Sequence, residues 1–145
     1  KFTANSHYDM FRIKETLGKD FMIYSGTDEM ALSGLAFGAD GLIGSNSNVM
    51  SQPFMKLFDE MRRGNLDAAR QIQEKVNRII FIHLKHDLIP SIKQTLIWDG
   101  CDGGPCRRPF QTLTGEKSES LRADLLKVRS EIGDCGLDFM KNLDL

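Results

Sequence analysis

The sequence predicts an α/β fold over its first 64 residues, followed by a segment that is entirely helical. Two short apolar runs, residues 21–24 and 42–43, are each followed by a segment with helical periodicity. Buried strands that alternate with helices are typical of parallel β/α units. After Gly64 no strand pattern is legible, and amphipathic helical patterns follow one another to residue 132.

The first β/α unit is preceded by a helix predicted over residues 8–17, with Ser6 as its cap and Gly18 as its end. Residues 21–24 then form an apolar strand. A second helix is predicted over residues 28–38, and the two carboxylates in its first turn suit the positive end of the helix dipole.

The second unit consists of a strand at residues 42–43 and a helix over residues 51–63. Pro53 lies in the first turn of this helix, where a missing N–H group is tolerated, and Gly64 ends the helix. Its apolar side chains recur with helical spacing, so we expect one face to pack in a core.

The second half contains three predicted helices, over residues 66–88, 91–98 and 120–132. Pro90 separates the first two, and a loop rich in glycine and proline covers residues 99–109. The long first helix has a predicted buried stripe of Leu66, Ala69, Ile72, Val76, Ile79, Ile80 and Leu84.

Two β/α units do not complete any known sheet architecture. An open doubly wound sheet needs more strands, and a closed (β/α) barrel needs eight strands and about 250 residues. We therefore expect this sequence of 145 residues to be the C-terminal part of a longer polypeptide.

The composition excludes several classes of protein. Hydrophobic residues at 41% and charged residues at 27% are typical of a globular domain, and a net charge of -1 argues against nucleic acid as a partner. No apolar run approaches the roughly 20 residues that a membrane-spanning helix needs. His83 and His86 lack a third ligand for a metal site.

Three cysteines, Cys101, Cys106 and Cys135, have no metal-binding spacing. They fit free thiols in a reducing compartment, and we expect a cytoplasmic protein. A disulfide between Cys101 and Cys106 is the alternative.

Polar loops that follow strands are where binding and catalytic groups collect, because the scaffold beneath them is rigid. Such loops are residues 25–29 and 44–48, and Lys1 offers an amine. Each feature also has a simpler interpretation. The carboxylates of Asp28 and Glu29 are common at helix starts, the glycines are common in turns, and a terminal lysine is usually a solvated charge.

Five motifs in a fixed order and spacing are specific together, although each is weak alone. They are Lys1-Phe2-Thr3, Ser25-Gly26-Thr27-Asp28-Glu29, the run from Gly38 to Ser45 with Asn48, the segment 64–69, and Cys106-Arg107-Arg108-Pro109-Phe110. In this order they resemble the N-acetylneuraminate lyase branch of the pyruvate-dependent class I aldolases. The same superfamily holds dihydrodipicolinate synthase.

The resemblance implies the C-terminal part of a (β/α)8 TIM barrel, from the end of strand six onward, followed by a helical extension. Residues 1–64 would form the last β/α units of the barrel, and residues 65–145 would form the extension. Members of this family usually assemble as homotetramers.

The resemblance also implies an activity, which is the reversible cleavage of N-acetylneuraminate to pyruvate and N-acetylmannosamine. By match, Lys1 is the catalytic residue that forms a Schiff base with pyruvate, so neither a metal nor another cofactor is expected. The only expected ligands are small molecules, a sugar acid and pyruvate. The implied substrate-binding residues are Thr3, Gly26, Asp28, Glu29, Gly44 and Ser45.

Two alternatives stay open. Asn46 and Ser47 stand where the lyases usually have Thr-Tyr, so a 2-keto-3-deoxy sugar acid aldolase or a dihydrodipicolinate synthase is the second hypothesis. The third is a non-catalytic fragment, because the family's catalytic tyrosine and carboxylate-binding loop belong to the first half of the barrel. Neither Tyr8 nor Tyr24 lies in a motif that would replace that tyrosine.

Overall fold

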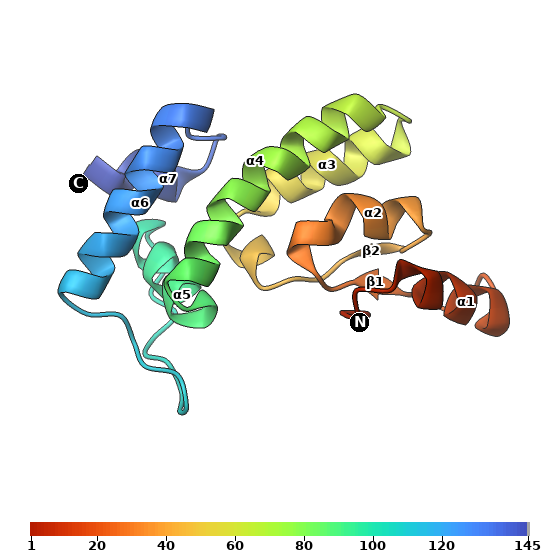
Figure 1. The fold of residues 1–145 in the computed structure, drawn as a ribbon, viewed down its shortest axis with the longest axis horizontal. Helices are drawn as coiled ribbons and strands as arrows, with labels where there is room; N and C mark the ends of the chain where they lie inside the picture. Colours follow the sequence, from red (N-terminus) through yellow and green to blue (C-terminus); the bar gives the residue numbers. More distant parts are fainter. Residues whose placement is uncertain (145) are drawn as a thin grey trace.

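A computed structural model describes residues 1–144, in which a small parallel sheet lies against a layer of helices (Figure 1). The strands are β1 (Tyr24–Ser25) and β2 (Gly41–Leu42). The α-helices are α1 (His7–Leu17), α2 (Ala31–Ala36), α3 (Ser51–Arg62), α4 (Leu66–Lys85), α5 (Leu88–Trp98), α6 (Glu116–Ile132) and α7 (Asp138–Lys141). Short 3-10 helices are η1 (Asp28–Met30), η2 (Asn46–Asn48) and η3 (Asn142–Asp144).

Three parallel segments form the sheet, with β1 in the middle. Tyr24 pairs with Gly41 of β2, and Phe2 forms an isolated parallel bridge to Ser25 on the other side. The bridge rests on two hydrogen bonds, from Phe2 N to Tyr24 O at 2.8 Å and from Gly26 N to Phe2 O at 2.7 Å. The parallel β/α arrangement predicted from the sequence is therefore confirmed.

The strands are shorter than the apolar runs that predicted them. Phe21 and Met22 are 47% and 54% exposed, and only Ile23 of the predicted first strand is buried. Ile43 is also exposed. Hydrogen-bonded ladders, and not apolar composition, define strands, and the ladder here extends over two residues in each strand.

Helix α1 is joined to the sheet by a lysine. Lys14 Nζ lies 2.5 Å from Asp40 Oδ2, and the same oxygen accepts a hydrogen bond of 2.7 Å from Ile23 N. The side chain of Ser6 caps this helix by accepting from Asp9 N, as the sequence predicted.

Helix α4 is the centre of the helical layer and contacts α2, α3, α5 and α6 (Figure 1). Residues from both predicted segments share one core. Its largest fully buried side chains include Met50, Leu57, Ile79, Ile80, Leu121, Leu125, Phe139 and Met140. The division of the chain at residue 64 stays a prediction.

The predicted stripe of α4 is wrong at both ends. Leu66 and Leu84 are each 46% exposed, whereas His83 is fully buried. His83 lies seven residues after Val76 and four residues after Ile79, so it faces the same side of the helix as they do. Leu84 is rotated by about 100° from His83 around the helix axis. The inward-facing residue at this level is a histidine and not a leucine.

The break between α4 and α5 occurs earlier than predicted. Asp87 has a φ of 68°, and α5 begins at Leu88. Pro90 is buried in the first turn of α5, where its missing N–H group has no helical partner to lose. Pro90 therefore lies inside a helix and does not separate two helices.

The long loop between α5 and α6 is held by one side chain of α5. Lys93 Nζ donates to the carbonyl oxygens of Gly103 at 2.6 Å, Gly104 at 3.1 Å and Pro105 at 3.2 Å. The loop also carries Cys101 and Cys106, which are free thiols, so no disulfide joins them.

The tail after α6, where the sequence made no prediction, folds back onto that helix. Phe139 and Met140 of α7 are fully buried, and Arg129 donates to Met140 O at 2.7 Å. Arg129 also pairs with the Asp144 carboxylate. No helix within residues 1–144 combines the length and apolar character that crossing a bilayer requires.

Candidate active site

The predicted site residues lie at the carboxyl ends of the three parallel segments. In parallel sheets these ends share one edge, and the loops that follow them collect ligand-binding groups. Gly26 and Asp28 follow β1, Gly44 and Ser45 follow β2, and Lys1 and Thr3 flank Phe2 in the third segment.

Lys1 and Thr3 lie on the same side of their segment, as the alternation of an extended chain predicts. Both cover Gly26. A Cβ atom at Gly26 would come within 2.5 Å of both Lys1 Cε and Thr3 Cγ2, so only a glycine lets these side chains approach the loop. Lys1 itself is exposed, and it forms no salt bridge within residues 1–144.

The second cluster centres on the Asp28 carboxylate, which is buried. Asp28 Oδ2 accepts hydrogen bonds from Asn46 N at 2.8 Å and from Asn46 Nδ2 at 3.2 Å. A Cβ atom at Gly44 would overlap the carboxylate, so the absence of a side chain there creates the space that Asp28 occupies. Asp28 therefore links the loop after β1 to the loop after β2, and its side chain bonds to the start of η2 and not to η1, the helix that Asp28 begins.

Glu29 and Ser45 lie at the same edge of the sheet but take no part in the Asp28 cluster. Both are half-buried. Their carbonyl oxygens accept from Asn77 Nδ2 at 3.2 Å and from Asn48 Nδ2 at 2.9 Å, respectively. Within residues 1–144, the Glu29 carboxylate and the Ser45 hydroxyl form no hydrogen bond, so both groups are available to a ligand.

Helix α4 supports the loop after β1 through two amide side chains. Gln73 Nε2 donates to Asp28 O at 3.1 Å and to Asn77 Oδ1 at 2.8 Å, while Gln73 Oε1 accepts from Leu32 N at 2.8 Å. These bonds hold the backbone of residues 28–32 against α4.

A buried histidine stands behind the loop after β2. His83 Nδ1 lies 2.8 Å from Asn46 Oδ1, and His83 Nε2 lies 3.1 Å from Thr95 Oγ1. Burial, with a smaller contribution from nearby His86, lowers the pKa of His83 to about 4, so the ring is neutral at neutral pH.

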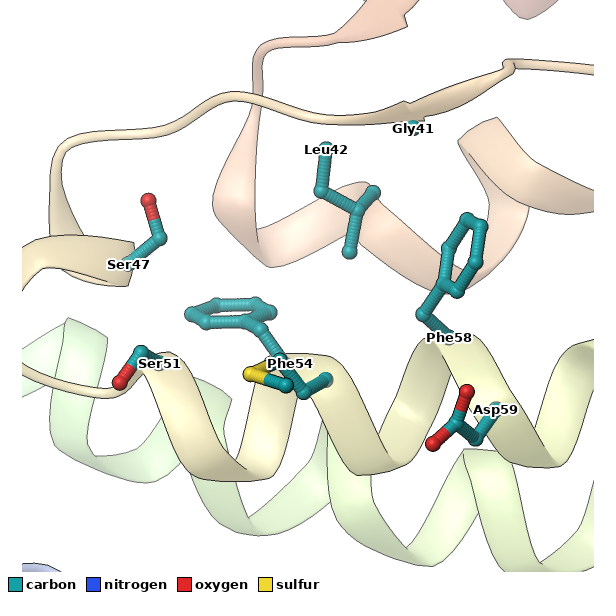
Figure 2. Close-up of a pocket in the computed structure, with 8 residues that line it drawn as sticks. Gly41, Leu42, Ser47, Ser51, Phe54, Phe58 and Asp59 are labelled. Atoms are coloured by element: carbon teal, nitrogen blue, oxygen red, sulfur yellow. The ribbon is translucent and has the colours of Figure 1, made fainter.

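An apolar hollow of about 290 Å³ lies between β2 and α3, outside the predicted site. Figure 2 shows Leu42 pointing from β2 toward α3 and the rings of Phe54 and Phe58. Its lining holds only one ionisable side chain, Asp59, which is exposed. The described residues also contain no group of three His, Cys, Asp or Glu side chains that could hold a metal ion.

Comparison with known families identifies this arrangement. The sequence profile of the Dihydrodipicolinate synthetase family matches residues 1–128. The chain belongs to this family. The resemblance drawn from the motifs is thereby confirmed.

Individual members of the dihydrodipicolinate synthetase family are similar to this chain in sequence and in structure. The N-acetylneuraminate lyase of Rhizobium meliloti (strain 1021) is 36% identical over 128 residues, which are 88% of this chain and 42% of that protein. The structure of Fusobacterium nucleatum N-acetylneuraminate lyase complexed with pyruvate matches with a TM-score of 0.78 at 29% identity, over 90% of this chain and 43% of that chain.

Two further solved structures of the family are similar. CdNal from Clostridium difficile, in complex with mannosamine, has a TM-score of 0.79 at 30% identity, over 85% of this chain and 42% of that chain. A catalytic lysine mutant of the Ruminococcus gnavus sialic acid aldolase has a TM-score of 0.76 at 26% identity, over 89% of this chain and 44% of that chain.

The chain thus spans less than half the length of the family members that it matches. The predicted fold class, part of a (β/α)8 barrel followed by a helical extension, is confirmed by the solved structures of the family.

The structure brings together two sets of the predicted site residues. One set is Lys1, Thr3 and Gly26, and the other is Asp28 and Gly44. The sequence prediction missed Asn46 and the buried polar side chains behind it. A signal for His83 was present, because it falls on the apolar stripe of a long helix, where a polar residue needs a partner.

Proposed function

We propose that this chain contributes the Schiff-base lysine and part of the substrate pocket to a class I aldolase. The reaction is the reversible cleavage of N-acetylneuraminate to pyruvate and N-acetylmannosamine. The observation that carries the proposal is the meeting of Lys1 and Gly26 at the sheet edge where Asp28 and Gly44 also meet. An amine and a sugar-binding carboxylate are two of the groups that this reaction requires.

Lys1 Nζ attacks the ketone carbon of the 2-oxo acid, and loss of water gives a protonated imine. When the carbon–carbon bond of the aldol breaks, its electron pair moves toward the imine nitrogen and forms an enamine. The hydroxyl on the departing carbon loses its proton and becomes the aldehyde of N-acetylmannosamine. Protonation of the enamine and hydrolysis of the imine then release pyruvate and regenerate the lysine.

The family resemblance implies that the hydroxyl proton is taken by a tyrosine from the first half of the barrel. We therefore expect the 145-residue chain to show no turnover alone. Detectable cleavage by the purified chain would contradict this part of the proposal.

The hydroxyl groups of the sugar would be bound by Asp28, Glu29 and Ser45, with Thr3, Gly26 and Gly44 shaping the space around them. Carboxylates accept hydrogen bonds from hydroxyl groups in charge-assisted pairs, which suits a polyol. The proposal is supported by the ligands of two similar structures, since the Fusobacterium nucleatum lyase is complexed with pyruvate and CdNal is in complex with mannosamine.

Several further properties belong to the same proposal. We expect no metal or organic cofactor, assembly as a homotetramer and a cytoplasmic location. Residues 1–64 would complete the barrel, and residues 65–145 would form its helical extension.

The test is borohydride trapping of the full-length protein with pyruvate, followed by peptide mass mapping. A reduced adduct is expected on Lys1 and is expected to disappear in Lys1→Arg. An adduct on another lysine, or none, would contradict the assignment of the nucleophile.

The substrate is tested separately by comparing cleavage of N-acetylneuraminate with that of 2-keto-3-deoxy sugar acids. Preference for N-acetylneuraminate, reduced in Glu29→Asp, is the expected result. Preference for another acid would favour the second hypothesis, for which the Asn46-Ser47 pair is the specific observation.

A further inference from the structure

A continuous row of buried polar side chains leads from helix α5 to the candidate sugar-binding carboxylate. The row runs from Thr95 Oγ1 to His83 Nε2 at 3.1 Å and from His83 Nδ1 to Asn46 Oδ1 at 2.8 Å. It ends with Asn46 Nδ2 at 3.2 Å from Asp28 Oδ2. His83 and Thr95 are fully buried, and Asn46 and Asp28 are 2% and 8% exposed.

The chemistry of the groups fixes the direction of the hydrogen bonds between Asp28, Asn46 and His83. An ionised carboxylate only accepts, so the Asn46 side chain must turn its NH₂ group toward Asp28 and its oxygen toward His83. His83 Nδ1 must then carry the hydrogen. Because burial keeps the ring neutral, His83 Nε2 is an acceptor. The single hydrogen of the Thr95 hydroxyl is shared between His83 Nε2 at 3.1 Å and Ser91 O at 2.8 Å.

This row engages only one of the two carboxylate oxygens. Asp28 Oδ2 receives both hydrogen bonds from Asn46, through the backbone N and through Nδ2. Asp28 Oδ1 accepts none within residues 1–144, and it lies over Gly44, which has no side chain to cover it. One oxygen is fixed, and the other is left for a hydroxyl donor.

We infer that Asn46, His83 and Thr95 are positioning residues that hold the Asp28 carboxylate by Oδ2, so that Oδ1 faces the sugar portion of the substrate. The identity of that ligand rests on the proposed function. The row acts on the sugar end of the site and not on the lysine end, because within residues 1–144 none of its members forms a hydrogen bond with Lys1 or Gly26.

The inference predicts that loss of the row weakens binding of the sugar substrate and leaves the reaction with pyruvate unchanged. In the full-length protein, His83→Leu removes the donor to Asn46 while keeping an apolar volume in the core. We expect KM for N-acetylmannosamine, measured in the condensation direction, to rise about tenfold or more, since small misplacements of a binding group have effects of this size. Trapping of pyruvate on the lysine is expected to stay unchanged.

Two further variants separate positioning from a structural role. His83→Asn keeps a donor near the place of Nδ1 and is expected to restore most of the affinity for N-acetylmannosamine. His86→Gln is a control at the C-cap of the same helix, where the ring contacts Asp124, and it is expected to change KM for neither pyruvate nor N-acetylmannosamine. An unchanged KM in His83→Leu, or equal losses for pyruvate and N-acetylmannosamine, would overturn the inference.

Should His83→Leu fail to fold, Thr95→Val is the nearly isosteric replacement that removes the hydroxyl shared by His83 Nε2 and Ser91 O, and a rise in the same KM is expected. The state of the ring is tested without any activity by the ¹⁵N chemical shifts of the histidines. We expect the neutral Nδ1–H tautomer for His83 at pH 7. The Nε2–H tautomer would refute the positioning role of His83 even if the protein is an active lyase. An inactive protein with the expected tautomer would refute only the proposed function.

Discussion

Acidification should weaken the fold through His83 before it affects the carboxylates of Asp40 and Asp124. In the unfolded chain an ordinary imidazole binds a proton as the pH falls below 6.5, whereas the buried His83 keeps a pKa of about 4. Between these values the unfolded state binds more protons, so the free energy of unfolding decreases as the pH decreases. Each unit of pKa difference corresponds to about 1.4 kcal/mol, so the loss amounts to about 3 kcal/mol.

The pH range separates His83 from the two carboxyl groups whose pKa is lowered. The pKa of Asp40 is lowered chiefly by its hydrogen bond from Lys14, and that of Asp124 chiefly by its hydrogen bond from Lys85. Lowered carboxyl pKa values stabilise the fold above the ordinary value of 3.8, and this stabilisation is lost only as the pH falls further. Loss of stability between pH 6.5 and about 4 is therefore expected from His83.

The assay is urea unfolding followed by circular dichroism at several pH values from 7 to about 4, for the wild type and His83→Leu. We expect a decrease of about 3 kcal/mol in the wild type and a nearly constant value in the variant. An identical decrease in both proteins would refute the reasoning. The reasoning would also be refuted if the His83 ring, followed by NMR in the folded protein, titrated near pH 6.5.

Three further predictions concern other parts of the molecule. Gly44→Ala should displace the Asp28 carboxylate and weaken sugar binding at least about tenfold in the full-length protein. The control Gly103→Ala should leave sugar binding unchanged, because its new methyl group makes only an ordinary van der Waals contact. Leu121→Ala should lower the free energy of unfolding by about 2–5 kcal/mol in urea titrations, because Leu121 is fully buried. The thiol of Cys135 should react more slowly with Ellman's reagent than the other two thiols, because burial raises its pKa.

Periodicity in the sequence predicts most of the helices, because amphipathic spacing reports directly on which face is buried. The helix predicted over 51–63 is observed as α3 over Ser51–Arg62, and the helix predicted over 120–132 ends at Ile132. The strands are predicted less well. A run such as residues 21–24 is apolar enough for a strand, but its ladder depends on partner backbones distant in the sequence.

In the candidate site, too, features with a local sequence pattern were predicted and features that depend on distant residues were not. Gly26, Asp28 and Gly44 were predicted from the family resemblance, because the loop motifs that carry it are contiguous in the sequence. The row behind them could not be predicted, because Asn46 and His83 are 37 positions apart and belong to different elements. Only the packing of α4 against the loop after β2 makes them neighbours. A polar residue on an apolar helical stripe is the local sign that such a partner exists.

Lys93 has a consequence for the loop between α5 and α6. Three carbonyl oxygens around its ammonium group resemble the coordination of an alkali ion, except that this cation is tethered to a helix. The contact acts as a non-covalent cross-link that closes a ring of about ten residues and lowers the entropy of that segment. Acylation of this one amine would remove the charge and leave one N–H donor in place of three. The loop, with its two cysteines and the Arg107-Arg108 pair, would then behave as a longer and looser tether between two helices.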